Sequence, residues 1–217
     1  DYQPSRGLGD VYKRQLVRCF DSEKITHVNS KISPSSDLET IKTEIVLSDL
    51  DIVQKKLEKG KKKLLQDKEI KILEEKLNQL DKNQEVKINN EEENKFLSSI
   101  GLLSIKPKII VCNVDEENLS KGNRYTKEVQ NKYPDEKIIN ICADIEDQLS
   151  GLDKNEKEAF MQDIGLNKTG LNQLIKEGYD LLKLDTFFTS GPEESRAWTV
   201  RKNTYAPKAA SVIHTDF

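Results

Sequence analysis

Residues 108–116 read Lys108-Ile109-Ile110-Val111-Cys112-Asn113-Val114-Asp115-Glu116. The apolar run after Lys108 does not alternate with polar residues, which is typical of a strand buried on both faces of a sheet. A second run of this kind covers residues 138–142, and a predicted helix over residues 123–133 lies between the two. Apolar strands joined by a helix predict a parallel sheet covered on both faces, so the expected fold class is α/β.

Composition narrows the class of protein. The chain has 217 residues, 35 Lys+Arg against 38 Asp+Glu and a formal net charge of −3, which excludes a uniformly basic nucleic-acid coat but leaves room for a local basic patch. No apolar run approaches the length of a membrane span, about 18 residues. The three cysteines, Cys19, Cys112 and Cys142, form no C-x-x-C, so we expect neither a disulfide framework nor a metal site. These features predict a helix-rich cytoplasmic protein with no membrane partner.

Both ends of the sequence have unusual features. Residues 1–15, DYQPSRGLGDVYKRQ, show no helical or strand period and no signal-peptide pattern, and we interpret them as a leader of non-native appearance. A strand is predicted over Leu16–Phe20. At the other end, residues 211–217 are predicted as a strand in which the chain stops. We therefore expect a fragment of a longer protein.

Two helical arms are predicted between residues 34 and 81. Pro34–Asp37 supplies a turn and an N-cap. Apolar or small side chains then recur three and four residues apart, the spacing of a coiled-coil arm, at Thr43, Val46, Leu50, Val53 and Leu57. A second series follows a break in register, at Ile70, Leu73, Leu77 and Leu80. The break predicts an antiparallel helical hairpin, and the alternative is one long helix with a skip.

The remaining segments carry clear start and stop signals. Asn90 precedes three glutamates, which predicts a helix that ends before Gly101. Further helices are predicted at 153–163 and 168–183. After Lys183 the aromatic pair at 187–188 and the run 197–200 flank Gly191-Pro192, which predicts a β-hairpin and a domain boundary near residue 184.

Two candidate site segments follow the buried strands. In open parallel sheets, ligands bind at the carboxyl ends of strands. Asn113-Val114-Asp115-Glu116 and Cys142-Ala143-Asp144 occupy such positions. The Asn amide can donate to and accept from one purine edge, and small residues allow backbone N–H groups to approach a ligand. Taken alone the first motif is weak, because an ordinary polar loop between a strand and a helix has the same composition.

Several longer motifs together resemble the YchF-type Obg-like ATPases, a branch of the P-loop GTPase class. The matching stretches are VRCFDSEKITHV, SDLETIKTEIVLSDL, KIIVCNVDE, ICADIE and FFTSGPEESRAWTVRKNTYAPKAASVIHTDF. The resemblance implies a partial P-loop nucleotide-binding domain with an antiparallel coiled-coil insertion, followed by a partial β-grasp (TGS) domain. The implied divisions are a leader at 1–15, nucleotide-binding domain at 16–42 and 90–184, insertion at 43–89, and TGS domain at 185–217.

The resemblance also implies a role for each motif residue. Asn113, Val114, Asp115 and Glu116 match the family's N-x-x-E base-reading loop, and Cys142 and Ala143 match a following S-A motif. The implied cofactor is ATP with Mg²⁺. Ordinary GTPases read guanine with an N-K-x-D loop, whose Asp carboxylate accepts hydrogen bonds from the guanine N1–H and 2-amino groups. Because Glu116 stands in place of that Asp, one reason to choose guanine is removed, and GTP is expected to bind more weakly than ATP. Asn113 is expected to bond the purine N7 and the 6-amino group, and Val114 to contact the base.

One family motif is missing. No G-x-x-x-x-G-K-[ST] occurs in the 217 residues, so the phosphate cradle, its lysine and the Mg²⁺-binding hydroxyl are absent from this chain. We name no catalytic residue and no metal ligand. The full-length protein is expected to hydrolyse ATP, and this chain is expected to be inactive.

Basic residues suggest a second kind of partner. The run at Lys55, Lys56, Lys59, Lys61, Lys62 and Lys63 is either a solvated helix face or a docking site for ribosomal RNA, which the resemblance suggests. Arg196, Arg201 and Lys202 lie near Trp198 in the predicted TGS part, and Trp198 is expected in the core. The rival functions are an RNA- or ribosome-binding module without nucleotide hydrolysis and a coiled-coil adaptor.

Overall fold

The computed structural model describes residues 13–22, 31–60 and 65–214. Its central layer is a three-stranded parallel sheet in the order β1-β2-β3. The elements in chain order are β1 (Lys13–Arg18), α1 (Pro34–Lys59), α2 (Asp67–Asp81), α3 (Glu91–Ser99), β2 (Lys108–Asn113), η3 (Glu116–Asn118), α4 (Arg124–Lys132), β3 (Lys137–Ile141), α5 (Ala143–Ser150), α6 (Lys154–Asp163), α7 (Gly170–Leu181), β4 (Leu184–Ser190), β5 (Ser195–Arg201) and α8 (Ala206–Ala210).

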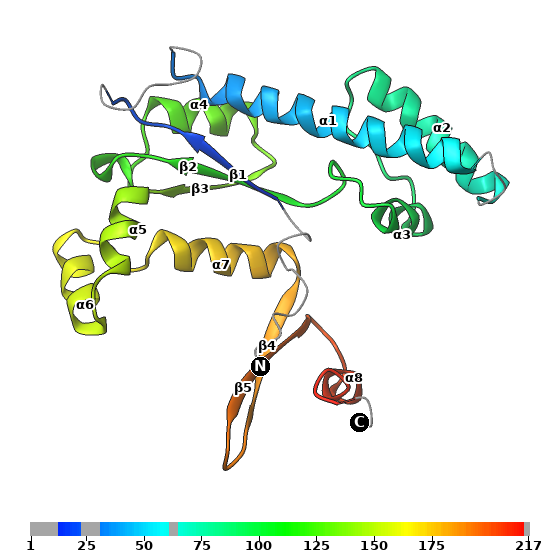
Figure 1. Cartoon of the computed structure of the whole chain (residues 1–217). Helices are drawn as coiled ribbons and strands as arrows, with labels where there is room; N and C mark the ends of the chain where they lie inside the picture. The colour runs from blue at the N-terminus through cyan, green and yellow to red at the C-terminus, as the bar shows by residue number, and fades with distance from the viewer. Residues whose placement is uncertain (1–12, 23–30, 61–64, 215–217) are drawn as a thin grey trace.

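Helices cover both faces of this sheet, as the sequence predicts. Ile110 and Cys112 of β2 point into a core that α1 and α4 complete. The alternate residues Ile109 and Val111 pack with Leu174 and Leu181 of α7. Figure 1 shows α1 and α4 above the sheet and α7 below it. Strand β2 is therefore buried on both sides, which explains its unbroken apolar run.

Strand β1 starts earlier than predicted. Lys13–Arg18 pairs in register with Lys108–Asn113, so residues 13–15 of the predicted leader belong to the sheet. Parallel pairing uses backbone N–H and C=O groups, which do not require an apolar period. The strand predicted over Leu16–Phe20 therefore begins at Lys13 and ends at Arg18, and residues 1–12 lie outside the described part of the chain.

The two helical arms form the predicted hairpin. Helices α1 and α2 lie side by side and run in opposite directions (Figure 1), which excludes one long helix. Val46, Val53, Leu57, Leu73 and Leu80 are buried between them, and the other residues of the two apolar series are half-buried. Helix α1 already begins at Pro34, which needs no N–H partner in a first helical turn.

Helix α3 packs against this hairpin. Asn90 caps α3 by accepting a hydrogen bond from the N–H of Glu93, as predicted, and Gly101 adopts a positive φ of 85° after the helix. Leu97 and Leu102 belong to the same apolar cluster as Val46 and Leu73. The division of the chain at residue 90 stays a prediction, and the packing groups α3 with α1 and α2.

In the C-terminal part the predicted β-hairpin is confirmed, and one predicted strand is wrong. Strands β4 and β5 pair antiparallel, with Phe187 opposite Trp198. The predicted strand at 211–217 is wrong over residues 211–214, and residues 215–217 lie outside the described part. Ala206–Ala210 forms the short helix α8, and the N–H groups of Val212 and Ile213 continue its turn by donating to the carbonyls of Ala209 and Ala210. Alanine-rich helix propensity prevails there over the apolar pair Val212-Ile213.

Candidate functional site

The two predicted site segments lie next to each other at one edge of the sheet. Asn113 ends β2 and is the register partner of Ile141, which ends β3. The N–H of Val114 donates to the carbonyl of Ile141 at 2.8 Å, so the pairing continues one residue beyond the strand. The parallel sheet thus brings the Asn113 loop and the Cys142 turn together, as expected for neighbouring carboxyl ends.

Asn113 joins the two segments directly. Its side-chain oxygen accepts a hydrogen bond from the N–H of Ala143 at 3.0 Å. Its backbone carbonyl accepts a hydrogen bond from the N–H of Cys19 at 2.7 Å, which ties the end of β1 to the same place. The oxygen retains a second lone pair and the amide NH₂ group has two donors, so the side chain can still bond a purine edge.

The next residues of the loop differ in what they offer to a ligand. Val114 is only 2% exposed and packs in the core with Val17 and Tyr125, so its side chain has a packing role, and the contact with a base stays a prediction. Asp115 caps η3, where its carboxylate accepts hydrogen bonds from the N–H and the side-chain amide of Asn118. Glu116 is exposed and is the carboxylate of this motif that the loop itself does not use.

An acidic cavity of about 910 Å³ opens beside this loop. Its lining carries four carboxylates, Asp115, Glu116, Glu117 and Asp163, against one cation, Lys121, and its apolar walls include Ile145 and Leu166. Acceptor groups over an apolar wall suit a flat ring that carries an amino group, and they disfavour phosphate. The cavity therefore fits the base of a nucleotide better than its phosphates.

Cys142 occupies the N-cap of α5 and is buried. Burial raises the pKa of the Cys142 thiol, while hydrogen bonds from the backbone N–H groups of Ile145 and Asp144 act in the opposite direction. The thiol is therefore a small neutral packing group with weak acceptor character. Ala143 is exposed, and its N–H is engaged by Asn113 rather than free for a ligand.

Helix α5 and one of its contacts were not predicted. Ile145 and Leu149 are both buried and lie four residues apart, a helical signal that the sequence contains. Glu146 of α5 accepts a hydrogen bond from the N–H of Gly170 at 2.6 Å. A Cβ atom on Gly170 would lie 2.8 Å from Cγ2 of Ile141, so only glycine allows α7 to start so close to β3 and α5.

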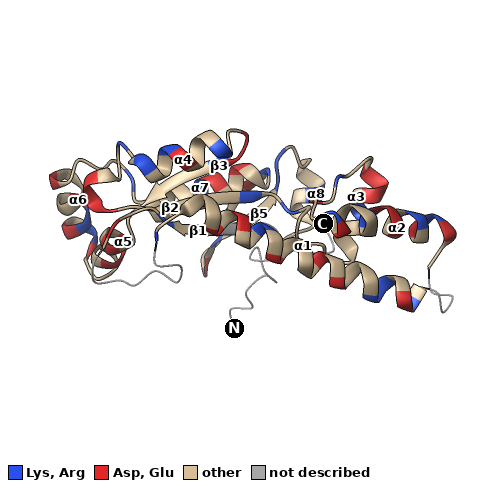
Figure 2. Cartoon of the chain, turned by 90° about the horizontal axis from the view of Figure 1, so that it is seen from above, with Lys and Arg blue, Asp and Glu red and all other residues tan. Residues whose placement is uncertain are grey.

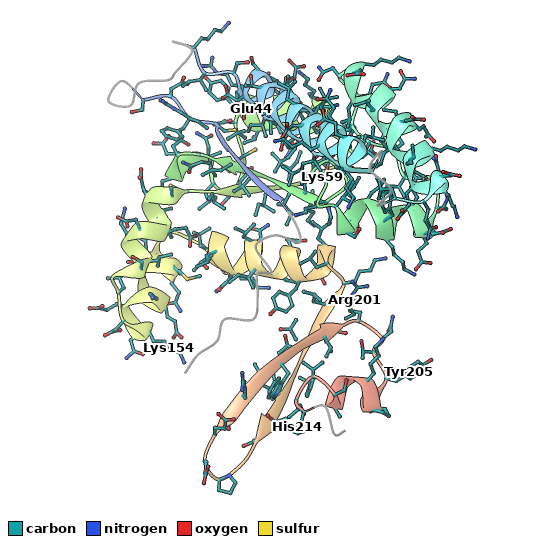
Figure 3. The ribbon with its side chains drawn as sticks, turned by 45° about the vertical axis from the view of Figure 1, so that its right-hand side comes forward. Glu44, Lys59, Lys154, Arg201, Tyr205 and His214 are labelled. Carbon is teal, nitrogen blue, oxygen red and sulfur yellow. The ribbon has the colours of Figure 1, made fainter. Side chains whose placement is uncertain are left out.

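The predicted RNA-binding residues form two separate groups. Lys55, Lys56 and Lys59 lie on the last turns of α1, where Lys55 is paired with Asp51 at 2.6 Å, and Figure 2 shows acidic and basic residues interspersed along this helix. Lys61, Lys62 and Lys63 lie outside the described residues. The second group lies on and directly after the β4–β5 hairpin, and Figure 3 shows Arg201 at a distance from Lys59 of the first group. In this second group Arg196 stacks on Trp198, and Lys202 pairs with Asp180 at 2.7 Å. Arg201 is exposed.

Trp198 is half-buried, and its indole N–H donates to the hydroxyl of Thr189 at 2.8 Å.

Within residues 13–22, 31–60 and 65–214, no group of three or more His, Cys, Asp or Glu side chains is placed to hold a metal ion. In the same part of the chain, no helix is both long enough and apolar enough to cross a membrane.

The fold and the joined loops define a mixed α/β protein with a parallel sheet, a helical hairpin between β1 and β2, and a C-terminal β-hairpin.

The family model YchF-GTPase_C, described as a protein of unknown function (DUF933), matches residues 184–217. The "Ribosome-binding ATPase YchF" of Haemophilus influenzae is 39% identical over 214 residues, and that of Bacillus subtilis is 35% identical over 214 residues; each alignment covers 93% of this chain.

A solved structure gives the same result. The Schizosaccharomyces pombe YchF GTPase superposes with a TM-score of 0.78 at 30% sequence identity over 94% of this chain. The chain belongs to the YchF family. It spans 58% of the length of these two curated relatives and 58% of the solved structure's chain.

Proposed function

We propose that the full-length protein is a cytoplasmic ribosome-associated NTPase that binds and hydrolyses ATP and binds GTP more weakly. The relatives' names, which include "Ribosome-binding ATPase YchF", support the class of activity and the partner. The observation that carries the proposal is the hydrogen bond between Asn113 and Ala143, because it joins the two segments predicted to read the base. The divisions at 16–42, 43–89, 90–184 and 185–217 are part of the same proposal.

The residues present fit the base of the nucleotide. The amide of Asn113 would donate to the purine N7, and the exposed carboxylate of Glu116 would accept from the 6-amino group of adenine. Asp115 caps η3 through its Oδ1 atom, which would leave Oδ2 as a further acceptor on the side of the cavity. Val114, Cys142 and Ala143 would hold the loop in place by packing and by the bond to Asn113.

The residues present do not fit the phosphates or Mg²⁺. The 217 residues contain no G-x-x-x-x-G-K-[ST], and the charged lining of the cavity beside the base loop is four carboxylates against the single cation Lys121. Negative lining repels a triphosphate, so we derive no hydrolytic step from this chain. We expect the chain alone to have no ATP turnover.

The test is equilibrium binding and turnover of ATP and GTP by the 217-residue chain and by the full-length protein. We expect turnover only from the full-length protein, and micromolar ATP binding by the 217-residue chain alone would contradict the proposal. In the full-length protein, Asn113→Ala should weaken ATP binding, and Glu116→Asp should narrow the preference for ATP over GTP. Glu158→Asp is the matched control, because Glu158 is an exposed residue of α6 that lies outside the motif and outside the lining of the cavity.

A second function is an RNA- or ribosome-binding module that acts without nucleotide hydrolysis. The observation that favours it is the group of basic side chains around the base of the β4–β5 hairpin, where Arg201 is exposed. Ribosome co-sedimentation of the 217-residue chain without added nucleotide would support this function, and dependence of co-sedimentation on ATP would count against it.

A further inference from the structure

Strand β3 forms one edge of the parallel sheet. It pairs with β2, and no other strand in the described part of the chain pairs with its outer side. The N–H of Val114 donates to the carbonyl of Ile141, so the backbone groups of Ile141 face β2. Because these groups alternate in direction along a strand, the N–H and C=O groups of Ile138 and Asn140 point outward. They are available to a further strand.

A cavity of about 330 Å³ lies along this open edge. Its back wall is the stretch of β3 from Ile138 to Asn140. Helix α4 lies above the sheet and α7 lies below it in Figure 1, and both helices contribute to the lining. The side chains that matter below are Leu119 and Gln130 on the α4 side, and Leu166, Lys168 and Gln173 on the α7 side. The cavity therefore occupies the position that a further strand would take beside β3.

Lys168 is the charged residue of this lining, which contains no carboxylate. Its side chain is exposed and takes part in no ion pair within residues 13–22, 31–60 and 65–214. The cavity beside the base loop, by contrast, carries four carboxylates against one cation. In a chain whose net charge is −3, an unpaired cation in a cavity without acids favours an anionic group on the ligand.

The position of Lys168 sets the direction of a bound strand. Gly170 follows two residues later, and a Cβ atom on Gly170 would lie 2.8 Å from Cγ2 of Ile141, the last residue of β3. Lys168 therefore lies toward the carboxyl end of β3. A strand parallel to β3 would bring its own carboxyl end to Lys168, whereas an antiparallel strand would bring an amino end. The cation favours the parallel strand with a terminal carboxylate.

The neutral part of the lining suits a short peptide. Leu119 and Leu166 are half-buried and offer apolar surface to its side chains. Gln130 and Gln173 are exposed, and their amides can both donate and accept hydrogen bonds. A nucleotide or a free phosphate could use the cation, but only another peptide backbone matches the spacing of the outward N–H and C=O groups on a strand edge.

We infer that the open edge of β3 binds the carboxyl-terminal end of another protein as a parallel strand. Its backbone pairs with Ile138 and Asn140, its terminal carboxylate contacts Lys168, and its last side chains pack on Leu119 and Leu166. The inference depends neither on nucleotide hydrolysis nor on association with the ribosome.

The experiment titrates the 217-residue chain into a peptide labelled with fluorescein at its amino end, with the sequence Gly-Gly-Thr-Val-Val, and measures anisotropy. The β-branched residues favour an extended conformation. The matched peptide has an amidated carboxyl end and differs by one charge. We expect saturable binding of the free acid below about 1 mM and binding of the amide about fivefold weaker. Failure of the free acid to saturate below about 1 mM would overturn the inference. Equal affinities of the two peptides would also overturn it, because the edge would then accept any extended segment.

Two lysine variants test the contact with the carboxylate. Lys168→Gln should weaken binding of the free acid about fivefold and leave binding of the amide unchanged. Lys154→Gln is the matched control, because Lys154 is an exposed lysine of α6 outside the lining of this cavity. It should change neither affinity. Equal losses in the two variants would overturn the inference, since binding would then follow net charge.

Two variants at Asn140 test the backbone pairing. Asn140→Pro removes the outward N–H and leaves the bonds between β2 and β3 in place, whereas Asn140→Ala removes the same side chain and keeps the N–H. We expect the Pro variant to bind the free acid about fivefold more weakly than the Ala variant, the effect of one lost hydrogen bond. Urea unfolding checks that both variants are folded. Equal affinities would overturn the pairing.

Hydrogen exchange tests the same pairing in the wild-type chain and does not depend on the folding of the Pro variant. A saturating concentration of the free acid should slow exchange at the amides of Ile138 and Asn140. The amides of Ile139 and Ile141 face β2 already and should not change. Unchanged exchange at Ile138 and Asn140 would overturn the inference.

Sedimentation equilibrium distinguishes a peptide from a second copy of the chain as the occupant of this edge. We expect a dimer, if one forms, to persist in Asn140→Pro, because the edge of β3 is not its interface. A dimer that Asn140→Pro dissociates and that the free acid does not displace would assign the edge to a second copy and overturn the inference.

Discussion

The side-chain oxygen of Asn113 accepts a hydrogen bond from the backbone N–H of Ala143, 3.0 Å away and thirty residues later in the chain. This bond fixes the distance between the ends of β2 and β3, where the predicted base-reading residues lie. Asn113 thus has a structural role in the chain as well as its proposed contact with a purine.

Asn113→Ala should release the N–H of Ala143. We expect faster hydrogen exchange at the Ala143 amide and a loss of about 0.5–1.5 kcal/mol in the free energy of unfolding, the usual net worth of one hydrogen bond. Asn113→Asp keeps an acceptor oxygen and should protect the amide. Unchanged exchange in the Ala variant would show that another group holds the two loops together.

Gly170 and Gly151 should respond in opposite directions to replacement by alanine. A Cβ on Gly170 would meet Cγ2 of Ile141 at 2.8 Å and the Glu146 carboxylate at 3.0 Å, so Gly170→Ala should cost about 1–3 kcal/mol of overpacking. At Gly151 the nearest atom is 3.9 Å away and φ is −84°, so Gly151→Ala should be neutral or stabilise by up to about 1 kcal/mol. Urea unfolding measures both. A stabilising Gly170→Ala would mean that α7 can shift away from β3.

The sequence contained enough local information to predict most of the secondary structure. The unbroken apolar run at Ile109–Cys112 predicted a buried strand, and Asn90, Asn123 and Asp153 each cap the helix that was predicted to follow them. The placement of Asn113 next to Cys142 followed from parallel topology, because the carboxyl ends of neighbouring strands share an edge. The base-reading roles assigned to these residues stay predictions.

Contacts between distant residues could not be predicted from local patterns. The bond from Ala143 to Asn113 and the bonds from Leu103 and Ser104 to Asp49 depend on how the elements pack. The burial of Val114 could not be predicted either. Its position in the motif indicated a contact with the base, but the side chain is buried in the core next to the end of β2. At Val212-Ile213, an apolar pair indicated a strand, and the preceding alanine-rich turn overrode it.

Lys76 and Glu93 form a buried ion pair. Removing only one of its two charges should lower the free energy of unfolding strongly. Lys76 has no exposed side-chain surface, and its ammonium lies 2.6 Å from Glu93 and 2.9 Å from Glu75. Lys76→Met should lower the free energy of unfolding by about 3–5 kcal/mol, because it leaves the Glu93 carboxylate buried without a cation. Lys76→Met combined with Glu93→Leu should recover most of this loss in urea unfolding. A double variant as unstable as Lys76→Met would show that the ion pair itself supplies the stability.

The same pair should give a pH dependence in the alkaline range. Burial alone would lower the pKa of Lys76, but hydrogen bonds to Glu93 and Glu75 outweigh it, and the pKa is raised from its ordinary value of 10.5. The contribution of Lys76 is therefore complete below about pH 10 and is lost as the pH rises through the raised value. Wild type should lose more stability than Lys76→Met between about pH 10 and pH 12. Since other lysines titrate there too, the difference between the two curves is the quantity to measure, and parallel curves would contradict the assignment.

Asp49 ties the helical arm to the segment that leads into β2. Its carboxylate is fully buried and accepts hydrogen bonds from the N–H groups of Leu103 at 2.6 Å and Ser104 at 2.7 Å. Asp49→Ala removes two charge-assisted bonds and leaves both N–H groups without a partner, so the free energy of unfolding should fall by about 3 kcal/mol or more. Asp49→Asn retains one acceptor and should lose less, with exchange remaining slow at one of the two amides. Equal losses in the Ala and Asn variants would show that the negative charge, rather than the two hydrogen bonds, holds this connection against α1.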